Sequence, residues 1–207
     1  TRVLRSKNVD GPYETMNGTV KDAANGANEN PTVLTHPYKF SAGSGWVGIS
    51  HCAVFDDGNG NWYYVSQQRM PANVAGINAS NAIMMGGVRS IKWMSNGWPT
   101  VMPERYGAVP QVAITESELV GEWENIDLAY QYGIQKASTN VTLSSEHKAS
   151  GAWNNVTWSF DASTNTLKIG TIDLKVQREV DWEASPRKVT IVYSGVSGNK
   201  SYWGKKK

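Results

Sequence analysis

The residues best suited to chemistry lie in the stretch 48–69, where His51 and the chain's only cysteine, Cys52, precede an apolar run and a Trp-Tyr-Tyr cluster. A histidine that follows a glycine-rich loop could present a ring nitrogen to a cavity, as a metal ligand or as an acid–base group. A hydrogen-bonded structural histidine is the alternative. Zinc is not expected, because no second His or Cys stands at ligand spacing.

The remaining cysteine and histidine positions offer less. Cys52 is expected to be a small buried apolar group, because a lone cysteine cannot form an internal disulfide. Adjacent residues of a strand point to opposite faces, so a catalytic pair of Cys52 and His51 is not expected. His36, which precedes a proline, and His147, which lies in a polar turn, are predicted to be solvated.

Carboxylates are the next candidates. Asp181 and Glu183 flank Trp182, so strand alternation places both acids on one face, a geometry that could serve a barrel mouth or a sugar cleft. A solvated face is the expected reading, because neither acid has apolar surroundings that would shift its pKa. For Glu104, an ion pair is expected and a general acid is the alternative. No acid pair, serine nucleophile elbow or phosphate loop emerges.

Composition limits the classes of partner. The chain has 207 residues, of which 18% are charged, with a net charge of +2. It has no basic stripe and no apolar run of about 18 residues, so neither nucleic acid nor a membrane is an expected partner. Nine Trp and nine Tyr, against three Phe, suit either sugar stacking or a β-rich core with amphipathic edges. The terminal Gly-Lys-Lys-Lys is expected to be a frayed tail.

Apolar and polar residues alternate with a period of two along much of the chain, which predicts half-buried antiparallel strands. Turn residues separate the strands, as at residues 57–61 (DGNGN) and 161–165 (DASTN). Thr115 and Glu118 have the spacing of a helix capping box, but Gly121 and a strand-like continuation argue against a helix there. We therefore predict an all-β chain.

A change of composition near residue 110 divides the chain into residues 1–110 and 111–207. The second part has enough strands for a closed barrel or a sandwich. Its Gly121-Glu122-Trp123 is similar to the Gly-x-Trp of lipocalin-like barrels, so a hollow, ligand-carrying barrel is one alternative. The first part predicts an open sheet, whose unpaired edges need covering.

Several strings resemble glycoside hydrolase family 43, a family of five-bladed β-propellers that includes arabinanases. Residues 5–13 (RSKNVDGPY) look like its "RS-x-N-x-x-GPY" strand and turn, and residues 111–207 resemble the C-terminal β-barrel domain of its two-domain members. Similarity to the last propeller blade of extracellular endo-α-1,5-arabinanases lies in residues 48–54 (GISHCAV), 62–64 (WYY), 88–91 (VRSI) and 97–106 (GWPTVMPERY).

The resemblance implies a partial propeller followed by a β-barrel, in a secreted enzyme that hydrolyses α-1,5-linked arabinan or arabino-oligosaccharides with inversion. Family members use an Asp general base, a second Asp and a Glu general acid. In chain order these precede the "RS-x-N-x-x-GPY" segment, so all three are expected before Thr1 and no catalytic residue is assigned to this chain. An N-terminal segment, covalent or separate, is expected to complete the propeller. A non-catalytic carbohydrate-binding β module is the alternative function.

The resemblance also implies a role for His51. The histidine of this Gly-x-x-His motif lies near the propeller axis in arabinanases and is associated with a metal, commonly calcium, whose other ligands are largely water. Calcium prefers oxygen ligands, so a lone imidazole in its shell is unusual chemistry. Gly87 departs from the family, since a histidine is expected there in related sequences.

Overall fold

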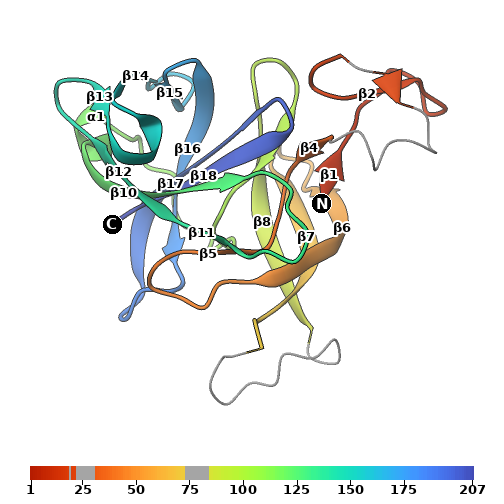
Figure 1. The fold of residues 1–207 in the computed structure, drawn as a ribbon, viewed down its shortest axis with the longest axis horizontal. Coiled ribbons are helices and arrows are strands. Elements are labelled where there is room, and N and C mark those ends of the chain that lie inside the picture. Colours follow the sequence, from red (N-terminus) through yellow and green to blue (C-terminus); the bar gives the residue numbers. More distant parts are fainter. Residues whose placement is uncertain (19, 22–30, 73–83) are drawn as a thin grey trace.

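The computed structural model describes residues 1–18, 20–21, 31–72 and 84–207. A four-stranded sheet stands beside a closed barrel, and the described residues are almost entirely strands and loops (Figure 1). The predicted all-β class is confirmed. No helix in these residues is long and apolar enough to cross a membrane.

The sheet has the antiparallel order β6-β7-β8-β9. The first hairpin turns at residues 57–61, as predicted, where Asp57 Oδ1 accepts hydrogen bonds from the N–H groups of Asn59 and Asn61 (2.8 and 3.1 Å). The proline-flanked β9 is an edge strand, which suits a residue that cannot donate a ladder hydrogen bond. The strands are β6 (Val47–Asp56), β7 (Trp62–Arg69), β8 (Met85–Trp93) and β9 (Pro99–Val101).

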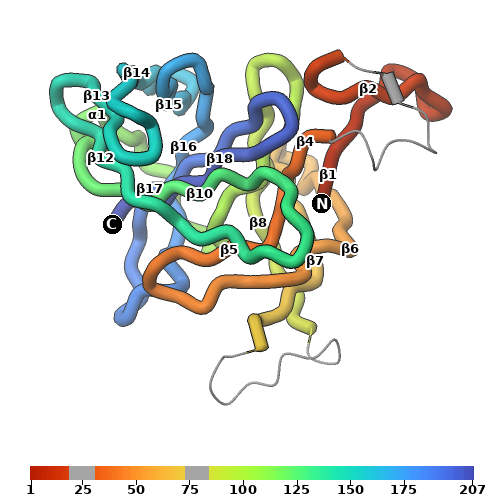
Figure 2. Tube along the Cα trace, viewed as in Figure 1, coloured from red at the N-terminus to blue at the C-terminus, as the bar shows by residue number. Residues whose placement is uncertain are grey.

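Three two-stranded pairs accompany this sheet. They join β1 (Arg2–Val3) to β4 (Thr32–Val33), β2 (Tyr13–Glu14) to β3 (Val20–Lys21), and β5 (Tyr38–Lys39) to β11 (Lys136–Ala137). The β5–β11 pair is parallel and ties together segments that are distant in sequence. Figure 2 shows these two segments, orange and green, running side by side.

The C-terminal part is a closed barrel of order β10-β12-β13-β14-β15-β16-β17-β18. Antiparallel pairing of the first strand with the last, from Trp123 opposite Lys206 to Leu128 opposite Ser201, closes it and decides between barrel and sandwich. The strands are β10 (Gly121–Leu128), β12 (Thr139–Leu143), β13 (Lys148–Ala149), β14 (Val156–Asp161), β15 (Thr166–Ile169), β16 (Ile172–Asp181), β17 (Lys188–Ser197) and β18 (Lys200–Lys206).

Two local predictions are wrong. The terminal lysines are not a frayed tail, because β18 extends to Lys206 to close the barrel. A one-turn helix, α1 (Glu116–Leu119), does form, and Thr115 N donates to Glu118 Oε2 (2.9 Å) as in a capping box. A 3₁₀ turn, η1 (Gly151–Trp153), is the other short helical element described.

The barrel interior is filled with side chains. Trp123, Leu143, Leu167, Leu174 and Tyr193 are all fully buried in one apolar cluster. Because side chains fill the space around its axis, the barrel has no room for a ligand there, which argues against the hollow, ligand-carrying alternative.

A second apolar core joins the barrel to the sheet. Tyr64 and Ile91 of the sheet pack in one cluster with Ile126, Leu128 and Trp203, which project from the outer surface of the barrel. The proposed division at residue 110 stays a prediction, and this core spans it.

Candidate functional site

His51 occupies a β-bulge in β6. Ser50 pairs with Gln67 and Cys52 with Ser66, so His51 is the extra residue between two neighbouring pairs. Its φ of 47° lies in the left-handed region that non-glycine residues seldom adopt. The bulge breaks the alternation of the strand, and both His51 and Cys52 are exposed. The prediction of a buried Cys52 is therefore wrong.

The ring of His51 is held by one neighbour. Gln67 Nε2 lies within hydrogen-bonding distance of Nδ1. With Nδ1 as the acceptor, Nε2 carries the ring proton, so a metal at Nε2 would require the Gln67 amide to turn its oxygen toward an Nδ1–H group. His51 does not belong to a cluster of potential metal ligands in the described part of the chain. The cluster found there consists of Glu104, Asp181 and Glu183, whose carboxylate oxygens lie within 4.8 Å of one another. One imidazole does not make a calcium site, because calcium takes six to eight ligands, mostly oxygens.

Gly87 lies opposite Ser66 in the next strand, and the space beside it is already taken. A Cβ at Gly87 would lie 2.5 Å from Gln68 Oε1. That oxygen accepts a hydrogen bond from the buried Arg89 Nη1 (2.9 Å). Ser66 Oγ and Gln68 Nε2 are buried without a hydrogen-bond partner among the described residues. Gln68 thus fills the position that a side chain at residue 87 would need.

The other two histidines differ in their environments. His36 is buried, and its Nδ1 and Nε2 lie 3.0 and 3.1 Å from the backbone oxygens of Pro37 and Gln131, so the prediction of a solvated ring is wrong. Burial lowers the pKa of His36. His147 is exposed, as predicted, and pairs with Glu116 (2.9 Å).

A buried charge cluster lies where the sheet meets the barrel. Lys205 Nζ on β18 lies 2.9 Å from Glu104 Oε1, 3.0 Å from Asp181 Oδ1 and 2.7 Å from Glu183 Oε2. The ring of Phe40 lies 4.4 Å from the same ammonium group. We call Glu104, Asp181, Glu183 and Lys205 the Lys205 cluster. The predicted solvated face for Asp181 and Glu183 is wrong, because β18 and the segment after β9 cover both acids.

One ammonium group does not neutralise three carboxylates. Burial raises the pKa of Glu104 to about 7, and neighbouring Glu183 adds to the rise while Lys205 opposes it. Burial alone would lower the pKa of Lys205, but Glu104 and Glu183 raise it above its ordinary value. The expected ion pair of Glu104 is real, and its partner is a lysine 101 residues away. The local sequence around Glu104 does not predict Lys205 as its partner, because the contact depends on barrel closure.

Comparisons with known proteins agree with this architecture. Residues 103–204 match the family model of the C-terminal lipocalin-like domain of glycoside hydrolase family 43. No curated protein sequence matches the chain.

Solved structures match nearly the whole chain. The glycoside hydrolase family 43 YxiA protein of Bacillus licheniformis has 25% identity and a TM-score of 0.82, over 99% of this chain and 48% of that one. The endo-1,5-alpha-L-arabinanase of Thermotoga petrophila RKU-1, in complex with TRIS, has 24% identity and a TM-score of 0.81, over 100% and 48%. The chain spans about half the length of these structures. The predicted part-propeller followed by a barrel is confirmed.

Proposed function

Because residues 103–204 match the model of the C-terminal lipocalin-like domain of glycoside hydrolase family 43, we propose that this chain is the C-terminal part of a secreted enzyme that hydrolyses α-1,5-linked arabinan with inversion. The observation that carries the proposal is the likeness of the whole chain, at TM-scores of 0.82 and 0.81, to about half of a glycoside hydrolase family 43 protein and of an endo-1,5-alpha-L-arabinanase. The catalytic Asp, Asp and Glu are proposed to lie in a segment before Thr1.

The Lys205 cluster is a poor candidate for the catalytic acids. An inverting glycosidase needs its two carboxyl groups roughly 6.5–9.5 Å apart, so that a water molecule fits between them and the sugar. In the cluster, ligand oxygens of Glu104, Asp181 and Glu183 lie within 4.8 Å of one another, and Lys205 occupies the space between them. Their chemistry is therefore that of a buried structural ion network.

One face of the sheet supports the proposal of a completing segment. Phe55, Val65 and Val88 are 55%, 38% and 38% exposed. They share a face with Ala53, because Ala53 pairs with Val65 and Val65 with Val88. Together these four residues form the apolar face. Propeller blades bury such faces against their neighbours, so a blade from the preceding segment would cover it.

Calcium at the propeller axis belongs to the same proposal. His51 Nε2 would be one ligand, and oxygen ligands would have to come from water and from the preceding segment, since His51 alone does not form the site. In that setting the ion would supply a fixed positive charge to the site. The β-bulge of β6 would aim the imidazole toward the axis.

The test compares two proteins, this chain and the complete protein with its preceding segment. The complete protein is expected to release arabino-oligosaccharides from linear α-1,5-arabinan, and proton NMR of the first product is expected to show inversion at the anomeric carbon. This chain alone is expected to be inactive. Hydrolysis by the purified chain at the rate of the complete protein would place the catalytic acids in this chain and overturn the assignment.

A further inference from the structure

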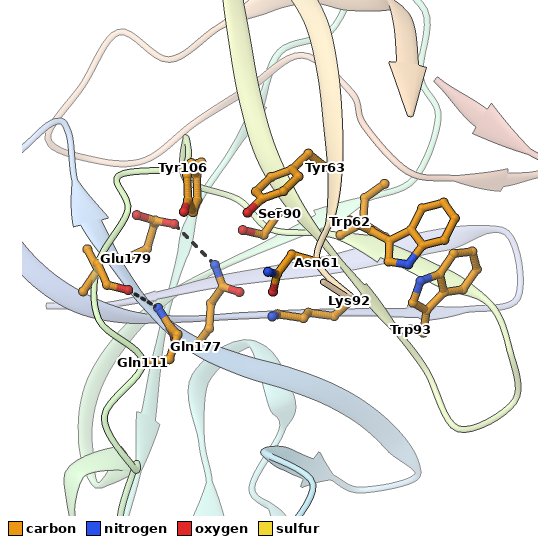
Figure 3. Close-up of a pocket in the computed structure, with 13 residues that line it drawn as sticks. Asn61, Trp62, Tyr63, Ser90, Lys92, Trp93, Tyr106, Gln111, Gln177 and Glu179 are labelled. Atoms are coloured by element: carbon orange, nitrogen blue, oxygen red, sulfur yellow. Dashed lines mark hydrogen bonds between the residues drawn. The ribbon is translucent and has the colours of Figure 1, made fainter. Parts of the chain in front are cut away.

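A pocket of about 330 Å³ lies between the sheet and strand β16 of the barrel. We call it the junction pocket. Figure 3 shows its side chains arriving from three places, the sheet, the segment after β9 and strand β16. Its lining includes Tyr63, Lys92, Trp93, Tyr106, Gln177 and Glu179.

Two pairs of aromatic rings line the junction pocket at separate places (Figure 3). Tyr63 and Tyr106 meet edge to face, with ring centroids 5.0 Å apart. Trp93, 46% exposed, meets Trp62 in the same manner at 5.5 Å. This second pair lies on the opposite face of the sheet, because Trp62 pairs with Ile91 whereas Tyr63 pairs with Ser90. Tyr106 remains 42% exposed, so part of its ring is available to a ligand. Flat rings with a polar edge stack well against the C–H faces of sugars.

Polar groups line the space next to Tyr63 and Tyr106 (Figure 3). Gln177 is only 4% exposed, and its Nε2 donates weakly to Glu179 Oε2 (3.4 Å). Glu179 Oε1 is occupied by the N–H groups of Gly107 and Val180 (2.8 and 2.9 Å). Figure 3 shows Lys92 reaching into the same space from β8. Amide, ammonium and carboxylate groups therefore offer both donors and acceptors within one small volume.

Lys92 is the least satisfied of these groups. Its ammonium makes no hydrogen bond or ion pair with any other described residue. Burial lowers the pKa of Lys92, while Glu179 acts in the opposite direction. A half-buried ammonium of this kind gains from a ligand oxygen that replaces lost water. Lys92 and Glu179 bring groups of opposite charge to the pocket, which suits a neutral ligand better than an anion.

The junction pocket is distinct from the apolar face described above. Tyr106 marks the border between the two, because its N–H donates to Val88 O (2.7 Å) and its ring packs on Tyr63. The apolar face offers only hydrocarbon, which suits another sheet. The junction pocket mixes rings with hydrogen-bonding groups, which suits a hydroxylated ligand of small size.

We propose that the junction pocket binds one or two sugar residues of a neutral polysaccharide, away from the propeller axis and without cleaving it. Stacking on the ring of Tyr106 would orient the sugar, and Lys92 and Gln177 would bind its hydroxyl groups. The identity of the sugar as arabinose rests on the proposed function, whereas the existence of the site does not.

Isothermal titration of the 207-residue chain with α-1,5-arabinotriose tests the site, with β-1,4-galactotriose and cellotriose as comparison probes. The chain is expected to bind arabinotriose at millimolar affinity. Tyr106→Ala and Lys92→Gln are expected to weaken binding about tenfold or more, whereas Tyr132→Ala, which removes an aromatic ring that is 88% exposed outside the pocket, is expected to leave it unchanged. Thermal melts establish that each variant is folded.

The outcomes separate the two proposals. Binding of another trisaccharide in place of arabinotriose, with the same loss in Tyr106→Ala and Lys92→Gln, would support the pocket and count against arabinan as the substrate. If none of the three trisaccharides binds, or if both pocket variants bind like the unmodified chain, the pocket proposal is overturned. Arabinan hydrolysis by the complete protein would still stand in that case.

Discussion

Lys205 Nζ lies 2.9 Å from Glu104 Oε1, although 101 residues separate them in the chain and both side chains are almost completely buried. Glu104 belongs to the segment that leaves the sheet, and Lys205 belongs to the last barrel strand. Their contact therefore joins the two parts of the molecule through charge, at the same junction where Tyr38 and Trp203 join them through packing. Asp181 and Glu183 complete the ion network from the end of β16 and the loop that follows.

Glu104→Gln is expected to alter how stability depends on pH. The pKa of Glu104 is about 7 in the folded chain and its ordinary value is 4.5, so the folded state holds the proton more tightly between these pH values. Stability from this group is present below pH 4.5 and is lost as the pH rises to 7. Relative to the unmodified chain, Glu104→Gln should therefore gain about 2–3 kcal/mol between pH 5 and pH 8, measured by urea unfolding.

Glu124→Gln supplies a control of opposite sign. Burial opposes ionisation of Glu124, but hydrogen bonds from Ser138 and Ser41 lower its pKa below the ordinary value. Its stabilising contribution is present above pH 4.5 and is lost as the pH falls below it. Glu124→Gln should lose stability at pH 7 and less at pH 4. A parallel pH dependence for the two variants would refute the raised pKa of Glu104.

Gly87→Ala is expected to destabilise the sheet by about 1–3 kcal/mol, because the new methyl group displaces Gln68 from Arg89. Gly86→Ala is the matched control on the same strand, since a Cβ at that position meets no atom within 4 Å. Chemical unfolding of both variants decides the matter. Equal effects at the two positions would show that Gln68 adapts without cost.

Thr115→Ala removes part of the capping box of α1 and is expected to cost about 0.5–1 kcal/mol, measured by thermal unfolding at pH 7. Glu118, the other member of the capping box, has a lowered pKa of about 2. The largest cause is the hydrogen bond from the Thr115 backbone, and the next is the hydrogen bond from the Arg178 side chain. The contribution of Glu118 is present above pH 4.5 and is lost as the pH falls to 2. Glu118→Gln should therefore match Thr115→Ala at neutral pH and approach the unmodified chain near pH 2. Glu146→Gln, in an exposed turn, serves as the control.

His51→Ala in the complete protein is expected to lower bound calcium and arabinan hydrolysis together, if His51 is an axial ligand. Metal content is measured by atomic emission after dialysis. His147→Ala, which removes an exposed histidine at a left-handed position far from β6 in sequence, is the control. Unchanged calcium in His51→Ala would eliminate the ligand role.

Local patterns sufficed for much of the fold. The hairpin at residues 57–61 and the turn between β14 and β15 both follow from turn residues and alternation that act over a few positions. Barrel closure needed more, because the pairing of β10 with β18 brings the two ends of the barrel sequence together. Alternation cannot distinguish a closed barrel from a sandwich.

The misjudged side chains share one cause. Lys205, Asp181 and His36 look solvated in sequence, and each is buried by a segment that is distant along the chain. The prediction for Cys52 was wrong in the opposite direction: it was expected to be buried, but the bulge at His51 turns it to an exposed position. Burial and bulges are tertiary properties, so spacing alone did not predict the Lys205 cluster or the junction pocket.

The apolar core between sheet and barrel bears on how such proteins can be recombined. Ile126, Leu128 and Trp203 lie outside the barrel and are fully buried only because Tyr64, Ile91 and their neighbours cover them. A barrel excised at residue 110 would expose this apolar surface to water, which would favour aggregation. A chimera that exchanges the propeller between such enzymes therefore has to keep the last blade and the barrel together from the same parent protein.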